Sequence, residues 1–188
     1  MKVDFPQGIY VIRCFVDDPD KLWFIHTPPE NAPWASAMEI TGKDFKQKVT
    51  GGEVPAEAFI QVINHRKNIL LYQVETGRYA AVDFNLKSDK AVRPTSGTDQ
   101  MSPVISFFVA ADELDRVGKE AEFELIAPTG KKTDGVAIRS VGQNRYVQIA
   151  GTGSRFLELQ GQKLSKIDLF AFERLFVLLL IFAKKNKQ

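Results

Sequence analysis

Short apolar runs separated by polar turns recur along the whole chain of 188 residues. In the run 156–159, apolar and polar side chains alternate with a period of two, which is typical of a strand with one buried face. Comparable runs predict strands near 9–12, 22–25, 37–40, 58–63, 69–74, 78–82, 91–93, 104–109, 123–126, 136–139, 146–149 and 169–175. Helical spacing is nearly confined to 110–121, where it predicts a short surface helix as an insertion. We therefore expect an all-β protein.

One motif, an apolar strand followed by a polar turn and an Arg-Tyr pair, occurs twice. Residues 136–149 align without a gap on residues 69–82. The alignment superimposes Val141 on Val74, Arg145 on Arg78 and Tyr146 on Tyr79. An aromatic residue at this place can plug the end of a β core, so we expect the two Tyr side chains to have a structural role.

A weaker copy of the motif precedes these two. Ile12 lies 59 residues before Leu71, which lies 67 residues before Ile138. Trp23 then takes the place of the two Tyr residues, after a longer turn. A period near 60 residues with about four strands per unit predicts a threefold architecture in one domain, 1–188. The expected repeats are 8–63, 68–126 and 135–183, with 104–109 as the closing strand of the second unit.

The composition excludes some classes of protein but does not indicate a function. Hydrophobic residues at 44% and charged residues at 26% are ordinary values for a globular domain. The formal net charge of +2 is too small to indicate a nucleic-acid partner. The aromatic residues are mainly Phe, 14 against 4 Tyr and 2 Trp, which indicates core packing.

The single cysteine, Cys14, lies in an apolar stretch and is expected to be a buried small side chain. With no internal disulfide, the reducing interior of a cell is the expected compartment, and we predict a cytoplasmic protein. The apolar run 9–15 contains Arg13 and is followed by acidic residues, unlike a secretory signal. The run 175–183, a strand or a short helix, is too short to cross a bilayer, so no membrane insertion is expected.

The sequence predicts no catalytic residue, cofactor or metal ligand. Only His26 and His65 accompany Cys14, without zinc-ligand spacing, and no nucleophile-elbow pattern surrounds any serine. The run 151–154, Gly-Thr-Gly-Ser, lacks the Gly-Lys and the helix that a phosphate loop requires, and it is interpreted as a tight hairpin. We therefore expect a protein that is not an enzyme.

Candidate ligand-binding residues come from the turns and loops. Arginines beside the motif aromatics alternate outward, where they can bind an anion or stack on a sugar. The Pro-rich loop 27–34 and the loop 94–103 are irregular surface segments. The predicted ligand-binding residues are Arg78, Arg145, Asn144, Trp34 and Arg93.

Three segments, 135–140, 144–149 and 170–175, resemble the repeat of fascin-like β-trefoil proteins. The resemblance is strongest over 135–175, weaker over 68–109 and weakest in the first unit. It implies a capped six-stranded barrel with threefold pseudosymmetry. The Gln-x-Trp repeat of ricin-type lectin trefoils is absent, because neither Trp23 nor Trp34 has Gln two positions before it.

The expected function is that of a non-catalytic binding module that recognises a protein or a glycan through its loops. Two alternatives stay open. Trefoil protease inhibitors use irregular loops, which this chain also has. Fascins bind actin with several trefoils in tandem, whereas this chain has room for one, so a single-trefoil actin-binding protein is the other alternative.

Overall fold

The computed structural model describes residues 1–14, 23–27, 34–39, 45–84, 103–128, 135–149, 156–159, 161 and 169–175. Twelve strands lie within these ranges: β1 (Gly8–Cys14), β2 (Trp23–His26), β3 (Ser36–Glu39), β4 (Phe59–His65), β5 (Asn68–Gln73), β6 (Arg78–Asp83), β7 (Val104–Val109), β8 (Phe123–Ile126), β9 (Ala137–Ser140), β10 (Arg145–Ile149), β11 (Leu157–Leu159) and β12 (Ala171–Arg174). The helical segments there are short: α1 (Phe45–Thr50), η2 (Ala56–Ala58), η3 (Ala111–Glu113), α2 (Leu114–Val117) and η4 (Gly118–Ala121). The all-β prediction and the helical insertion are confirmed.

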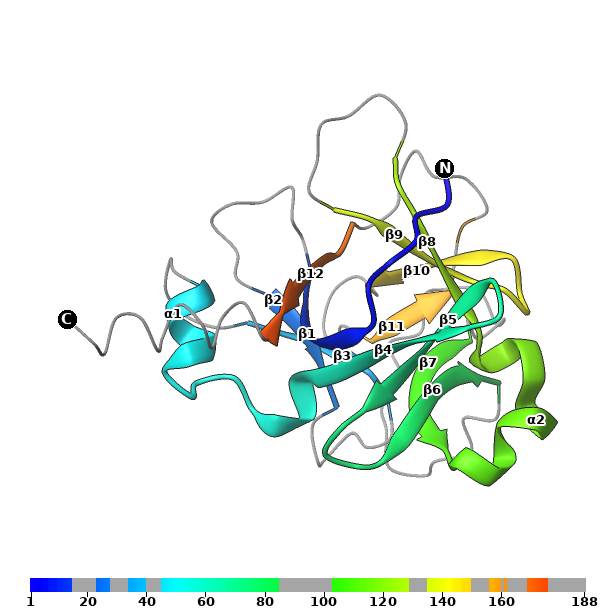
Figure 1. Ribbon diagram of the computed structural model, residues 1–188, viewed down its shortest axis with the longest axis horizontal. Helices are drawn as coiled ribbons and strands as arrows, with labels where there is room; N and C mark the ends of the chain where they lie inside the picture. Colours follow the sequence, from blue (N-terminus) through cyan, green and yellow to red (C-terminus); the bar gives the residue numbers. More distant parts are fainter. Residues whose placement is uncertain are drawn as a thin grey trace, which may run out of the picture.

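Six strands form a closed ring. Antiparallel pairing joins β1 to β4, β4 to β5, β5 to β8 and β8 to β9. A bridge between Val136 and Phe170 then connects the β9 side to the β12 side, and β12 pairs with β1 (Figure 1). Because the ring closes, its strands satisfy one another's backbone groups without a free sheet edge.

The other six strands form three hairpins, β2–β3, β6–β7 and β10–β11. Three links join these hairpins to one another: Trp34 with Ser106, Val104 with Glu158, and Ser36 with Phe156. The hairpins therefore meet as a triangle that caps one end of the ring. A six-stranded barrel capped by three hairpins is a β-trefoil, which confirms the predicted fold.

The main core fills the barrel and the cap. The equivalent residues Ile12, Leu71 and Ile138 are all buried in it, with at most 4% exposure, as the repeat alignment requires. Fully buried Phe123 and Phe170 add the largest side chains of the ring. The cavity left at the centre is about 10 Å³, no more than about one water molecule, so side chains close the interior.

The aromatic position of the repeat lies on the outer face of the barrel. In each unit it lies on the second strand and pairs with a residue of the first strand: Phe24 with Arg13, Tyr79 with Tyr72, and Tyr146 with Arg139. Each ring packs in one of three smaller clusters outside the main core. The two Tyr rings cover outer clusters and do not plug the end of the core as predicted. Phe24, not Trp23, is the third copy, since Trp23 points into the main core.

One further expectation needs correction. Strand β7 does not close the second unit, because it pairs with β6 and β11 as the third strand, and β8 is the fourth. A helix that was not predicted, α1, ends at residue 50. It packs Val49 on an outer cluster, and Gly52 with φ of 76° follows it in the left-handed region that ends helices.

The units differ between their third and fourth strands. Unit one carries α1 and η2 there, whereas unit two carries η3, α2 and η4, and these insertions lie at opposite edges of the molecule (Figure 1). Leu114 and Val117 of the second insertion pack against Leu70 and Ala121. This packing places the second insertion of unit two beside β5 and β8.

The residues that precede β1 extend along β8. The amide of Val3 donates to the carbonyl of Leu125 at 2.8 Å, and the amide of Ala127 donates to the carbonyl of Met1 at 2.8 Å. No helix among the described residues is long and apolar enough to span a membrane. The domain limits 1–188 stay a prediction, and the choice between strand and helix for 176–183 lies outside the described residues.

Candidate functional site

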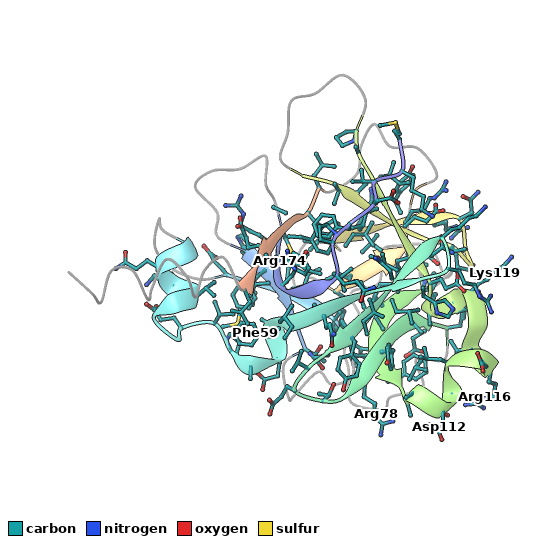
Figure 2. All side chains as sticks on the ribbon, viewed as in Figure 1. Phe59, Arg78, Asp112, Arg116, Lys119 and Arg174 are labelled. Carbon is teal, nitrogen blue, oxygen red and sulfur yellow. The ribbon has the colours of Figure 1, made fainter. Side chains whose placement is uncertain are left out.

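The structure separates the predicted ligand-binding residues. Arg78 is exposed and begins β6 (Figure 2). Arg145 is also exposed and begins β10, which belongs to the hairpin of another unit. Trp34 is only 8% exposed, and its ring packs edge-on to Phe156 at 5.6 Å. Arg93 lies outside the described residues. No common site of the five residues is seen in the described part of the chain, and their role in binding stays a prediction.

Asn144 serves the turn before β10. Its φ of 52° is in the left-handed region, which Asn tolerates better than most residues. Its Oδ1 accepts a hydrogen bond from Nη1 of Arg139 at 3.2 Å, and Arg139 also binds the carboxylate of Glu124. Asn144 therefore connects the predicted motif to a polar network on β8.

The centre of this polar region is the hairpin between β4 and β5. Its loop has two residues, Arg66 and Lys67, because His65 pairs directly with Asn68. Arg66 has φ of 56°, a conformation that costs a non-glycine residue about 1–2 kcal/mol. The loop thus holds a long cationic side chain in a strained position, and such strain is often found at functional sites.

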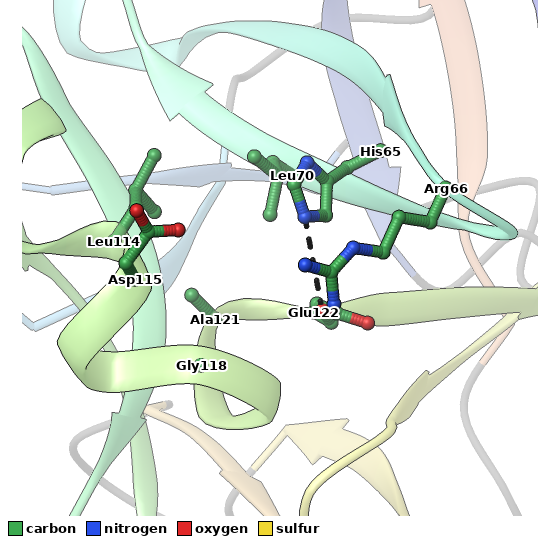
Figure 3. A pocket seen from close by; sticks show the side chains of 8 residues that line it. All are labelled: His65, Arg66, Leu70, Leu114, Asp115, Gly118, Ala121 and Glu122. Atoms are coloured by element: carbon green, nitrogen blue, oxygen red, sulfur yellow. Dashed lines mark ion pairs between the residues drawn. The ribbon is translucent and has the colours of Figure 1, made fainter.

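A hollow of about 80 Å³ lies on one side of the hairpin, between β5 and the second insertion (Figure 3). Its apolar floor is made by Leu70, Leu114 and Ala121, with the backbone of Gly118 beside it. Its polar rim consists of His65, Arg66, Asp115 and Glu122. Donors and acceptors thus surround a small apolar surface.

Glu122 lies just before β8, and its side chain is 8% exposed. Its Oε2 accepts a hydrogen bond from Nδ2 of Asn68, and its Oε1 lies 3.9 Å from Nε2 of His65. These contacts hold the carboxylate against the hairpin. The exposed Asp115 carboxylate, on α2, faces the hollow from the opposite side (Figure 3).

A second hollow of about 160 Å³ lies on the other side of the same hairpin, beneath the residues that precede β1. Its apolar lining includes Val3, Phe5 and Ile69. Its polar lining consists of charged and amide side chains: Lys2, Asp4, Asn64, Arg66, Lys67, Asn68 and Glu124. Arg66 lines both hollows. The hairpin tip is therefore the ridge between them.

Glu124 anchors the second hollow. Burial alone would raise the pKa of Glu124, but hydrogen bonds from Arg139 and from Lys2, at 3.0 Å, together with their charges, lower this pKa below its ordinary value. Glu124 is therefore a carboxylate at neutral pH, engaged by two cations. Nζ of Lys2 also donates to Oδ1 of Asn68 at 2.8 Å, which fixes the lysine at the rim.

The arrangement is suited to recognition. Among the described residues, no group of three His, Cys, Asp or Glu side chains could hold a metal ion. Cys14 is fully buried and lines neither hollow, and the ring of His26 packs edge-on to Phe24 with 5.8 Å between ring centroids. Both hollows are smaller than the roughly 300–1,000 Å³ of pockets that enclose small ligands. They can hold parts of a ligand that lies mainly on the surface.

The sequence interpretation missed this site. His65 was not among the predicted ligand-binding residues, but it ends β4, with its side chain 39% exposed, and lines a hollow. The alternation over 122–125 was a usable signal, since it places Glu122 and Glu124 on the face opposite Phe123. Nothing in the sequence showed that the hairpin 64–68 and the second insertion would adjoin this face.

Comparisons with known proteins agree with the fold. No protein-family model matches the chain. No curated protein matches its sequence. The structure of Polyporus squamosus lectin, bound to a human-type influenza-binding epitope, is similar with a TM-score of 0.57 and 12% identity, over 92% of this chain and 51% of the lectin chain. This chain thus spans about half the length of that lectin.

Two other solved structures are similar. The BEL β-trefoil has a TM-score of 0.54 and 15% identity, over 92% of this chain and 97% of its own. A GlcNAcα1-4Gal-releasing endo-β-galactosidase from Clostridium perfringens has a TM-score of 0.53 and 14% identity, over 89% of this chain and 32% of the enzyme. At these identities the similarity shows the β-trefoil fold alone. The fascin-like resemblance stays a prediction.

Proposed function

We propose that the protein is a non-catalytic binding module that recognises a glycan at the hollow between β5 and the second insertion. The observation that carries this proposal is the rim of His65, Arg66, Asp115 and Glu122 around an apolar floor. Sugar hydroxyls both donate and accept hydrogen bonds, so a rim that combines carboxylate acceptors with N–H donors can bind them. The apolar C–H face of a sugar ring fits a floor of aliphatic side chains.

The comparisons support this proposal as an analogy. Polyporus squamosus lectin is a glycan-bound protein of similar fold, although its low identity and partial coverage leave the ligand of this chain to experiment. The shallow hollow, about 80 Å³, suits a terminal sugar whose neighbours extend over the surface. The cytoplasm is the compartment we propose, since a chain with one cysteine cannot form an internal disulfide.

A protein ligand is the second candidate. Val74, Phe84 and Phe108 are exposed by 42%, 55% and 39%, and exposed apolar side chains favour protein contacts where they gather. The loops that would suit a protease inhibitor, 28–33 and 94–102, lie outside the described residues. Actin binding rests on the fascin-like resemblance alone.

A glycan array probed with the purified protein tests the proposal. We expect binding to a restricted set of glycans and at least a tenfold loss of affinity in Asp115→Ala, because this exposed carboxylate accepts hydroxyl donors without a structural role. Asp112→Ala, a matched exposed aspartate of the same insertion outside the hollow, should bind normally. Absence of glycan binding, or equal loss in both variants, would contradict the proposal.

A further inference from the structure

This inference rests on the proposed glycan-binding function. We propose that the recognised glycan is acidic and that its carboxylate is bound by Arg66 and Lys67 at the second hollow. The neutral part of the sugar then lies across the hairpin tip in the first hollow. The ligand class is thus a carboxylated sugar rather than a neutral one.

The first support is that these two cations have no partner. Neither Arg66 nor Lys67 makes a hydrogen bond or an ion pair through its side chain within the described part of the chain, and both are exposed. By contrast, Lys2 and Arg139 are bound to Glu124. Arg78 and Arg145 are also exposed, but they line neither hollow. The two cations of the tip are therefore free for an external anion.

The second support is the backbone that holds Arg66. The β4–β5 ladder runs through six residue pairs, from Ile60 with Gln73 to His65 with Asn68, so the tip is fixed by regular pairing. The first loop residue has φ of 56°, where glycine would be unstrained. No hydrogen bond or ion pair of the Arg66 side chain within the described residues offsets this strain. Binding of an external anion would explain why a guanidinium is held at this strained position, which interactions within the fold do not explain.

The third support is the local charge balance. The acidic groups facing the tip are Asp4 and Glu124 in the second hollow and Asp115 and Glu122 in the first. Glu124 is engaged by Lys2 and Arg139, and Glu122 by Asn68. In the second hollow only the carboxylate of Asp4 therefore opposes Arg66 and Lys67. The first hollow, which Arg66 also lines, keeps the negative charges of Asp115 and Glu122, because the amide of Asn68 is neutral. This difference directs a carboxylate to the second hollow.

The chemistry of Arg favours a carboxylate over other acceptors. Its planar guanidinium donates two parallel hydrogen bonds to the two oxygens of a carboxylate, whereas a hydroxyl accepts at one oxygen. Because Arg66 lines both hollows, one ring with its carboxylate substituent can reach both. Neutral sugars would use only the first hollow and bind more weakly.

The test compares a panel of carboxylated glycans with their carboxyl-reduced neutral counterparts, by calorimetry on the whole protein. We expect the acidic members to bind at least tenfold more tightly, and Arg66→Gln to weaken binding of the acidic members much more than binding of the neutral ones, so that most of this difference is removed. Lys67→Gln should show a smaller loss in the same direction. Lys48→Gln, a matched charge change on α1 remote from the tip, should bind like the unmodified protein.

Other outcomes overturn the inference in distinguishable ways. Equal affinity for acidic and neutral members would leave a glycan-binding protein without carboxylate recognition. Sulfated glycans that bind as tightly as carboxylated ones would show that charge alone is recognised. An acidic peptide that binds in an Arg66-dependent manner, with no glycan bound, would show a protein ligand and contradict the proposed function as well.

Discussion

The side-chain amide of Asn68 donates a hydrogen bond to the carboxylate of Glu122 and so joins the start of β5 to the residue before β8. Glu122 as a whole residue is 6% exposed, so its carboxylate depends on hydrogen-bond partners in the protein instead of water. We expect Asn68→Leu to lower the free energy of unfolding by about 1–3 kcal/mol, because a buried acceptor loses its donor. Urea denaturation measures this change.

A double variant controls for this effect. If the loss comes from the uncompensated carboxylate, Asn68→Leu combined with Glu122→Leu should be more stable than Asn68→Leu alone. Additive losses in the two single variants would instead show that the hydrogen bond contributes little.

Gln73 is a polar side chain fully enclosed in the fold, with 0% exposure. Its Nε2 donates to Oγ1 of Thr27 at 2.8 Å and to the carbonyl of Glu57 at 2.6 Å, and its Oε1 accepts from Thr76 at 2.7 Å. Gln73→Leu should lower the free energy of unfolding by about 2 kcal/mol or more, because partners in two units are left unsatisfied.

Thermal and urea unfolding check the prediction for Gln73. The half-buried Gln61 on β4 offers the control, since Gln61→Leu removes no hydrogen bond among the described residues and should change stability by about 0.5 kcal/mol or less. Similar effects of both substitutions would contradict the role given to the Gln73 contacts.

Glu124 should make stability depend on acid pH. Its pKa is lowered in the folded protein, so its ion pairs stabilise the fold above the unfolded value of about 4.3, and this contribution is lost as pH falls through the folded pKa. In Arg139→Met we expect the pKa of Glu124 to rise and the acid-dependent part of stability to shrink. NMR titration of the Glu124 carboxyl carbon measures the first effect, and an unchanged pKa would contradict it.

Arg66→Gly should separate stability from binding. Glycine adopts the φ of 56° without strain, so we expect the free energy of unfolding to rise by about 0.5–1 kcal/mol after the entropy of glycine is counted. The same change removes the guanidinium and should weaken binding of carboxylated glycans. Denaturation and calorimetry on the same sample check both parts, and a less stable variant would refute the strain argument.

Much of the fold was predictable because its apolar pattern is repeated. Ile12, Leu71 and Ile138 were aligned correctly, since a threefold barrel requires a similar inward side chain at each of these places. The third aromatic was misplaced by one residue, at Trp23 instead of Phe24. The two lie on opposite faces of β2, and both are apolar, so the pattern alone did not distinguish the outer position from the inner one.

The candidate site was much less predictable. His65 and Arg66 are far in sequence from Glu122 and lie beside it only because β5 pairs with β8 at Ile69 and Phe123. The sequence showed Arg78 and Arg145 instead, because they belong to the repeat. A sequence repeat shows only the features that the units share. This site instead depends on the insertion of the second unit, which is not part of the repeat.

The pairing of β1 with β12 has a consequence for how the protein folds. Tyr10 lies opposite Arg174, so the ring closes through residues 164 positions apart in the chain. Such distant pairing makes folding slow, on the order of milliseconds to seconds, since much chain entropy is lost before the contact forms. During synthesis β1 is made long before β12, so the edge of β1 that pairs with β12 stays unpaired for that interval. The nascent barrel then exposes a strand edge that can pair with another chain.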